Sequence, residues 1–152
     1  MPRSEVERKW GIAELKYRYL RAIDEDDTEM LLGCFTDDAV IDHVDGFGHM
    51  TGQDEYAVWC RNTTSGSMDS VHMAMNPLIE VDGDEGSGRW NFLVIIQEGD
   101  RVELAQGSEQ GEYRFVDGEW KYSELSTWRN FTIDISDLDV QRGRGDSVTG
   151  KG

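Results

Sequence analysis

The chain has 152 residues, 38% of them hydrophobic, which is the length and apolar content of one domain with its own core. Its 31 acidic residues against 15 basic ones give a formal net charge of -16, a field that repels nucleic acid and anionic membranes, so neither is expected as a partner. The N-terminal segment is charged and no apolar run has the length of a membrane span, so we expect a cytoplasmic protein.

Three helices are predicted in the N-terminal half. Residues 4–24 carry apolar side chains at helical spacing, and Ser4 with Glu7 has the spacing of a capping box. Asp26 or Asp27 then caps a short helix that continues through Phe35, and residues 54–61 form a third helix. The predicted apolar stripe of the first helix comprises Val6, Trp10, Ala13, Tyr17 and Leu20, widened by Ile12, Leu15, Tyr19 and Ile23.

The remainder of the chain has the pattern of strands. A strand is predicted at 39–44, followed by a glycine-marked loop, and further strands at 71–81, 89–97, 101–106, 112–116 and 119–133. Turns containing Gly83, Gly99 and Gly118 join the later strands as hairpins. Helices followed by an antiparallel sheet predict an α+β fold. Residues 1–136 form the predicted domain, and 137–152, rich in Gly, Arg, Asp and Ser, a flexible tail.

The two cysteines, Cys34 and Cys60, fall in the predicted helices without the spacing of a motif. We expect both to be reduced and partly buried, and to form neither a disulfide nor a metal site.

His72 and Asp24 are the residues with the clearest catalytic potential. His72 shares one face of its predicted strand with Ala74 and Asn76, so it points into any cavity that the sheet encloses. Asp24 ends the first helix, where a carboxylate needs a donor or cationic partner against the helix dipole. An imidazole oriented by a carboxylate is a general base at neutral pH. The alternatives are a partly buried structural histidine and an acidic turn at 24–27.

Tyr19 and Arg129 are candidates for supporting roles. Tyr19 precedes Asp24 by about 140° around the helix, so the two share a pocket only if Asp24 belongs to the following turn. Tyr19 is either a buried phenol with a hydrogen-bond partner or a donor to substrate. Arg129 lies near Trp128 and Phe131, where an unpaired cation is costly, so it should meet an acidic partner or an anionic ligand group.

Six segments together resemble a known family. They are IAELKYRYLRAID (12–24), CFTDDAV (34–40), GQDE (52–55), HMAMNP (72–77), GRW (88–90) and VDGEWK (116–121). In this order they resemble SnoaL-like proteins of the nuclear transport factor 2-like superfamily, over residues 7–131. The resemblance implies a cone-shaped, curved antiparallel sheet wrapped around the N-terminal helices and enclosing one deep, mostly apolar pocket.

The chain is most similar to the group that contains scytalone dehydratase, bile acid dehydratase and hexachlorocyclohexane dehydrochlorinase. This resemblance implies that Asp24 orients a catalytic His72, with Tyr19 and Arg129 as further catalytic residues. Two departures put the substrate of the bile acid enzyme in doubt: Val94 stands where that enzyme has a second acid, and Met75 where it has a second histidine. His43 is a candidate replacement donor, or else an ordinary edge-strand histidine.

The resulting hypothesis is a lyase without metal or organic cofactor, which catalyses a dehydratase-like elimination on a small cyclic or aromatic hydrophobic substrate. An isomerase or cyclase using the same base is one alternative, and a non-catalytic ligand-binding or assembly module is another. Apolar positions on both sheet faces predict a homo-oligomer, with a trimer favoured over a dimer. The predicted pocket walls are His43, Trp59, Trp90, Phe92 and Val94.

Overall fold

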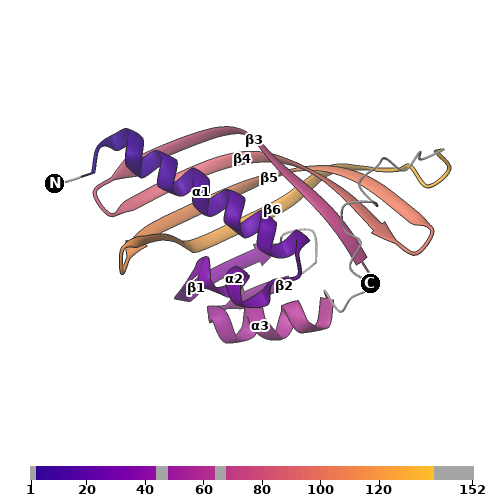
Figure 1. Ribbon diagram of the computed structural model, residues 1–152, viewed down its shortest axis with the longest axis horizontal. Helices are drawn as coiled ribbons and strands as arrows, with labels where there is room; N and C mark the ends of the chain where they lie inside the picture. Colours follow the sequence, from indigo (N-terminus) through magenta and orange to yellow (C-terminus); the bar gives the residue numbers. More distant parts are fainter. Residues whose placement is uncertain (1–2, 44–47, 64–67, 139–152) are drawn as a thin grey trace, which may run out of the picture.

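The computed structural model describes residues 3–43, 48–63 and 68–138 (Figure 1). The helices are α1 (Glu5–Asp24), α2 (Thr28–Gly33) and α3 (Gly52–Thr63). The strands are β1 (Phe35–His43), β2 (Gly48–Thr51), β3 (Met68–Asp82), β4 (Glu85–Glu98), β5 (Arg101–Val116) and β6 (Glu119–Asp134). Residues 139–152 of the predicted tail lie outside the described residues.

Helix α1 begins with the predicted capping box. The Ser4 hydroxyl accepts the backbone N–H of Glu7 at 3.3 Å, and the Glu7 carboxylate accepts the N–H of Ser4 at 2.7 Å. The predicted stripe is wrong at three positions, because Val6, Trp10 and Tyr17 remain 76%, 58% and 45% exposed. The sheet covers α1 from one side only, and that side holds the neighbouring residues Ile12, Leu15, Lys16, Tyr19 and Leu20.

Helix α2 is capped by Asp27, whose side chain accepts the N–H of Met30 at 2.9 Å. It ends at Gly33, and the predicted continuation through Phe35 is wrong because Phe35 begins β1 with its ring fully buried. Cys34 and Cys60 are both buried and are not joined in a disulfide.

The sheet has six strands in the order β2-β1-β6-β5-β4-β3. All neighbours are antiparallel except β1 and β6, which run parallel. Gly83, Gly99 and Gly118 have positive φ in the predicted hairpin turns. Two expectations are corrected: β2 forms within the glycine-marked loop, and the strands predicted at 101–106 and 112–116 are one strand, β5.

Glycine is required inside β5 because its neighbours approach closely. A Cβ on Gly107 would lie 2.2 Å from the Cζ atom of Phe92 and 2.4 Å from the carbonyl oxygen of Trp128. The register between β5 and β6 shifts beside Gly107 and again at Tyr113, and such irregularities bend a sheet. Gly107, in the gap between the two predicted strands, therefore allows one long, curved strand.

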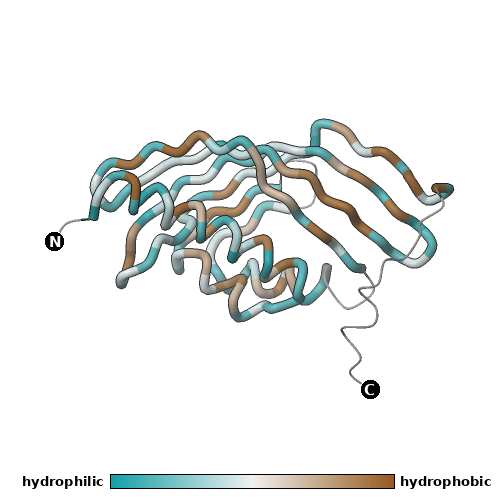
Figure 2. The backbone as a smooth tube through the Cα atoms, turned by 45° about the horizontal axis from the view of Figure 1, so that its top comes forward, coloured by the Kyte–Doolittle hydropathy of each residue, from teal (hydrophilic) through white to brown (hydrophobic). Residues whose placement is uncertain are grey.

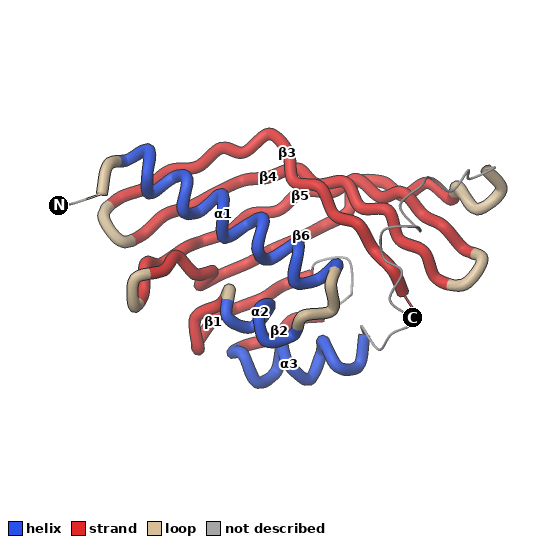
Figure 3. Tube along the Cα trace, in the orientation of Figure 1, coloured by secondary structure: helices blue, strands red, loops and turns tan. Residues whose placement is uncertain are grey.

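The curved, unclosed sheet carries all three helices on the same side (Figures 1 and 3). Figure 2 shows hydrophobic and hydrophilic residues alternating along the long strands, as expected for a sheet with one covered face. The main core lies between this face and the helices, around Leu15, Tyr19, Phe35, Tyr56 and Tyr122. The α+β fold with a curved sheet over N-terminal helices is confirmed.

Candidate active site

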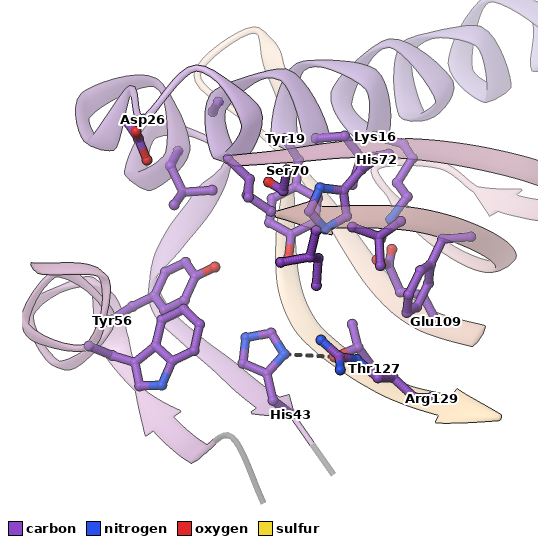
Figure 4. Close-up of a pocket in the computed structure, with 18 of the residues that line it drawn as sticks. Lys16, Tyr19, Asp26, His43, Tyr56, Ser70, His72, Glu109, Thr127 and Arg129 are labelled. Carbon is purple, nitrogen blue, oxygen red and sulfur yellow. Dashed lines mark hydrogen bonds and ion pairs between the residues drawn. The ribbon is translucent and has the colours of Figure 1, made fainter. Parts of the chain in front are cut away.

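A cavity of about 390 Å³ lies on the helix-covered side of the sheet. It takes side chains from all three helices and from strands β1, β3, β4, β5 and β6. Most of its wall is apolar, and its polar lining residues come from separate elements. The polar and aromatic lining residues include Lys16, Tyr19, Asp26, His43, Tyr56, Trp59, Ser70, His72, Glu98, Glu109, Thr127, Trp128 and Arg129 (Figure 4).

Asp24 and His72 are in direct contact. The Nδ1 atom of His72 lies 2.6 Å from Oδ1 of Asp24, and the backbone N–H of His72 donates to Oδ2 at 2.8 Å. The Ser70 hydroxyl donates to Oδ1 at 3.0 Å. His72 lines the cavity, whereas Asp24 is not among the described lining residues. Asp24 is therefore an anchor for His72 rather than a contact for a ligand.

Tyr19 and Asp24 do not share the cavity, in agreement with the helix geometry. Asp24 remains in α1 as its last residue, yet Tyr19 faces the cavity from the same helix. The two residues do not need to share the pocket, because Asp24 points towards β3 and His72 alone reaches the cavity.

The electrostatics of the pair favour an ionised Asp24. Burial by itself raises the pKa of Asp24, but the hydrogen bonds from the His72 ring, the His72 backbone and Ser70, with the His72 charge, outweigh burial and lower it. A carboxylate at Nδ1 selects the tautomer that carries its proton there. The Nε2 atom of neutral His72 is then an unprotonated base.

His43 lies at another part of the cavity and is held as a neutral imidazole. Its Nδ1 atom is 2.6 Å from the Thr127 hydroxyl, and its ring packs against Trp59 with centroids 4.9 Å apart. Burial lowers the pKa of His43 to about 4, although Asp42 raises it in part. Its Nε2 atom is buried and has no hydrogen-bond partner among the described residues. The edge-strand expectation is wrong, because β1 lies between β2 and β6.

Tyr19 and Arg129 also line the cavity, from α1 and β6. Burial raises the pKa of Tyr19 well above its ordinary value, and the neighbouring Tyr56 and Glu109 raise it further. The Tyr19 phenol is thus a neutral hydrogen-bond donor rather than an acid near neutral pH.

Of the predicted wall residues, His43, Trp59, Phe92 and Val94 line the cavity. Trp90 is 2% exposed but is not among the described lining residues. Its indole N–H donates to the Tyr113 hydroxyl at 3.1 Å, and Trp90 lies nearer the start of β4 than Phe92 and Val94. Trp90 is therefore placed in the packing beyond the cavity.

Further lining residues, which the sequence pattern does not predict, include Lys16, Ser70, Tyr56 and Glu109. Lys16 did carry a signal, because it is a charged residue four positions after Ile12 and three before Tyr19, within the buried face of α1. Glu109 gave no comparable signal, since it lies between the strands predicted at 101–106 and 112–116. Glu109 therefore brings a buried carboxylate to the cavity from β5.

Two further properties concern the described residues only. None of their helices is both long and apolar enough to cross a membrane. They also contain no group of three or more His, Cys, Asp or Glu side chains arranged to hold a metal ion.

The chain belongs to the SnoaL-like domain family, which it matches over residues 4–126. Similar solved structures confirm the nuclear transport factor 2-like fold. Hexachlorocyclohexane dehydrochlorinase LinA-type3 from Novosphingobium barchaimii is 22% identical, with a TM-score of 0.79 over 91% of this chain and 97% of that one. A proposed scytalone dehydratase from Novosphingobium aromaticivorans is 20% identical, with a TM-score of 0.78 over 90% and 91% of the two chains.

A proposed aromatic ring hydroxylase from Novosphingobium aromaticivorans is 22% identical, with a TM-score of 0.80 over 87% of this chain and 96% of that one. No curated protein sequence matches the chain. Because these neighbours carry names of different activities at low identity, the fold alone follows from them, and the reaction has to be argued from the site.

Proposed function

We propose that this protein is a cofactor-independent lyase that eliminates a small leaving group from a cyclic or aromatic hydrophobic substrate. The observation that carries the proposal is the 2.6 Å contact between Asp24 and the Nδ1 atom of a His72 that lines a mostly apolar cavity. The SnoaL-like family and the dehydrochlorinase and dehydratase among its structural neighbours agree with a lyase-type reaction.

The proposed reaction begins at the Nε2 atom of His72. This nitrogen removes a proton from a substrate carbon, and Asp24 stabilises the imidazolium that forms. The electron pair of the broken C–H bond becomes the new C=C bond as the neighbouring carbon loses its hydroxyl. The proton on Nε2 passes to the departing oxygen, so that water leaves and neutral His72 is regenerated.

Tyr19 and Arg129 are proposed to assist this step by donating hydrogen bonds to a substrate oxygen on which negative charge develops. The neutral Tyr19 phenol suits this role better than that of a proton source, because burial raises its pKa. His43, Trp59, Phe92 and Val94 are proposed to hold the ring system of the substrate.

An isomerase or cyclase reaction uses the same first step, with the proton returned to another carbon of the substrate. The dyad favours both reactions over a pure binding role, because binding a hydrophobic ligand does not require an oriented base. A non-catalytic ligand-binding or assembly module remains the alternative to be tested.

Proton abstraction can be tested before the substrate is known. Cyclic ketones such as 2-tetralone have acidic protons beside the carbonyl, and we expect the protein to accelerate their exchange in D₂O, measured as a mass increase. His72→Ala should lower this acceleration by about 10²–10⁴-fold, as loss of a general base does. Asp26→Asn is the matched control, since Asp26 lines the cavity without contacting His72.

Equal exchange by wild type and His72→Ala would refute the base. With β-hydroxy derivatives of the same ketones, product mass then separates the two reactions: a lyase product is lighter by one water, and an isomerase product keeps the substrate mass. Mass spectrometry of any ligand that copurifies with the protein would identify the ring system directly.

A further inference from the structure

The cavity contains a buried ion pair that the proposed reaction does not use. Lys16 from α1 donates to Oε2 of Glu109 on β5, and the two side chains are only 0% and 1% exposed. Tyr122 donates to the other carboxylate oxygen of Glu109 at 2.8 Å. Both members of the pair line the cavity, and Figure 4 shows them on the side away from Asp26.

Lys16 has more donors than protein partners. An ammonium group carries three N–H bonds, and Glu109 is the one hydrogen-bond acceptor that the described residues offer it. The Tyr19 ring, with its centroid 5.1 Å from Nζ, adds a weaker cation–π contact. Burial lowers the pKa of Lys16 while Glu109 raises it again. The ammonium therefore keeps donor capacity that an acceptor in the cavity can use.

Fold stability does not account for this pair. Removing two charges from water costs several kcal/mol each, and replacing a buried pair by apolar residues of similar size is often neutral or stabilising. The other buried residues of α1, including Ile12, Leu15 and Leu20, are apolar. A cavity-facing donor beside a cavity-facing acceptor is instead what recognition of a ligand requires.

We propose that Lys16 and Glu109 form a subsite for a hydroxyl group of the ligand, which accepts a hydrogen bond from the Lys16 ammonium and donates one to the Glu109 carboxylate. This assignment of the substrate rests on the proposed function. It describes the substrate as a neutral ring compound whose hydroxyl lies apart from the carbon that His72 deprotonates. Asp26 and Glu98, exposed lining residues, disfavour an anionic ligand at the opening.

Three matched probes test this subsite without knowledge of the substrate. 5-Indanol can accept and donate, 5-methoxyindane can only accept, and indane can do neither, so their dissociation constants are compared by NMR titration. Because a hydrogen bond to a charged group is worth about 1.5–3 kcal/mol, we expect wild type to bind 5-indanol at least about tenfold more tightly than indane, with the ether between them.

The variant Lys16→Met/Glu109→Gln removes both charges together and keeps an acceptor for Tyr122. It should bind 5-indanol and indane within about threefold of each other. Glu109→Gln alone retains the Lys16 donor, so the preference for the alcohol over the ether should shrink while the ether still binds more tightly than indane. If neither variant folds, the order of the three probes on wild type is the test, since equal binding of 5-indanol and indane overturns the subsite.

The two proposals fail in different ways. His72→Ala should lose exchange activity and retain the preference for 5-indanol, because it leaves the subsite intact. A wild type without that preference, or a folded double variant that keeps it, would overturn the subsite and leave the ion pair as a link between α1 and β5. Absent exchange activity with an intact preference would overturn the base alone.

Discussion

Replacing Asp24 by Asn should reverse the tautomer of His72. The Asp24 carboxylate accepts three hydrogen bonds, from the His72 ring at 2.6 Å, the His72 backbone at 2.8 Å and Ser70 at 3.0 Å. Asn offers one acceptor oxygen and one amino group. Because the backbone N–H cannot lose its proton, the oxygen should stay with it and the amino group should face Nδ1. His72 then carries its proton on Nε2 and cannot act as a base.

The cost in stability follows from the same three contacts. Hydrogen bonds to a charged group contribute about 1.5–3 kcal/mol each, against about 0.5–1.5 kcal/mol for neutral ones. In Asp24→Asn three hydrogen bonds to a charged group become neutral ones or are lost. Because the Asp24 side chain is 18% exposed, solvent screening reduces the cost, and the free energy of unfolding should fall by about 2–3 kcal/mol. For a domain of this size, Tm should fall by roughly 5–10 °C.

The tautomer is measured from the ¹⁵N chemical shifts of the His72 ring above neutral pH, and stability from thermal unfolding. Asp26→Asn is the matched control, because Asp26 lies just beyond the end of α1. Asp26 has a positive φ, which Asn tolerates. An Asp24→Asn protein that keeps its proton on Nδ1 and unfolds within about 1 °C of wild type would refute the oriented base.

Two further outcomes are expected. The folded pKa of His43, about 4, lies below the ordinary 6.5, so the unfolded chain binds more protons between these values and stability should fall by about 3 kcal/mol as pH drops from 6.5 to 4. Urea unfolding should show a larger loss of stability over this pH range in wild type than in His43→Gln. Equal losses in the two proteins would contradict the lowered pKa of His43. Val71 and Phe131 are 57% and 52% exposed, and light scattering should give a trimer; a monomer would contradict this.

Local features of the fold could be predicted from the sequence because their causes are local. The Ser4–Glu7 capping box and the glycine turns satisfy backbone groups within a few residues, and both are present in the structure. The sequence pattern predicts two strands, 101–106 and 112–116, where the structure has the single strand β5. Gly107 needs space against Phe92 on β4, and Gly111 against Tyr122 on β6. A local sequence pattern does not contain such contacts between strands.

The candidate site divides in the same way. The positions of His72 on one strand face and of Asp24 at a helix end are enough to predict the pair. Strand alternation also places His72 on the cavity side and the exposed Val71 and Met73 on the opposite face. Only the tertiary structure decided that Asp24 stands behind His72, that Trp90 lies beyond the cavity and that Lys16 meets Glu109. The physical reason is that sequence periodicity specifies which face a side chain occupies, whereas contact between faces depends on how the sheet curves over the helix.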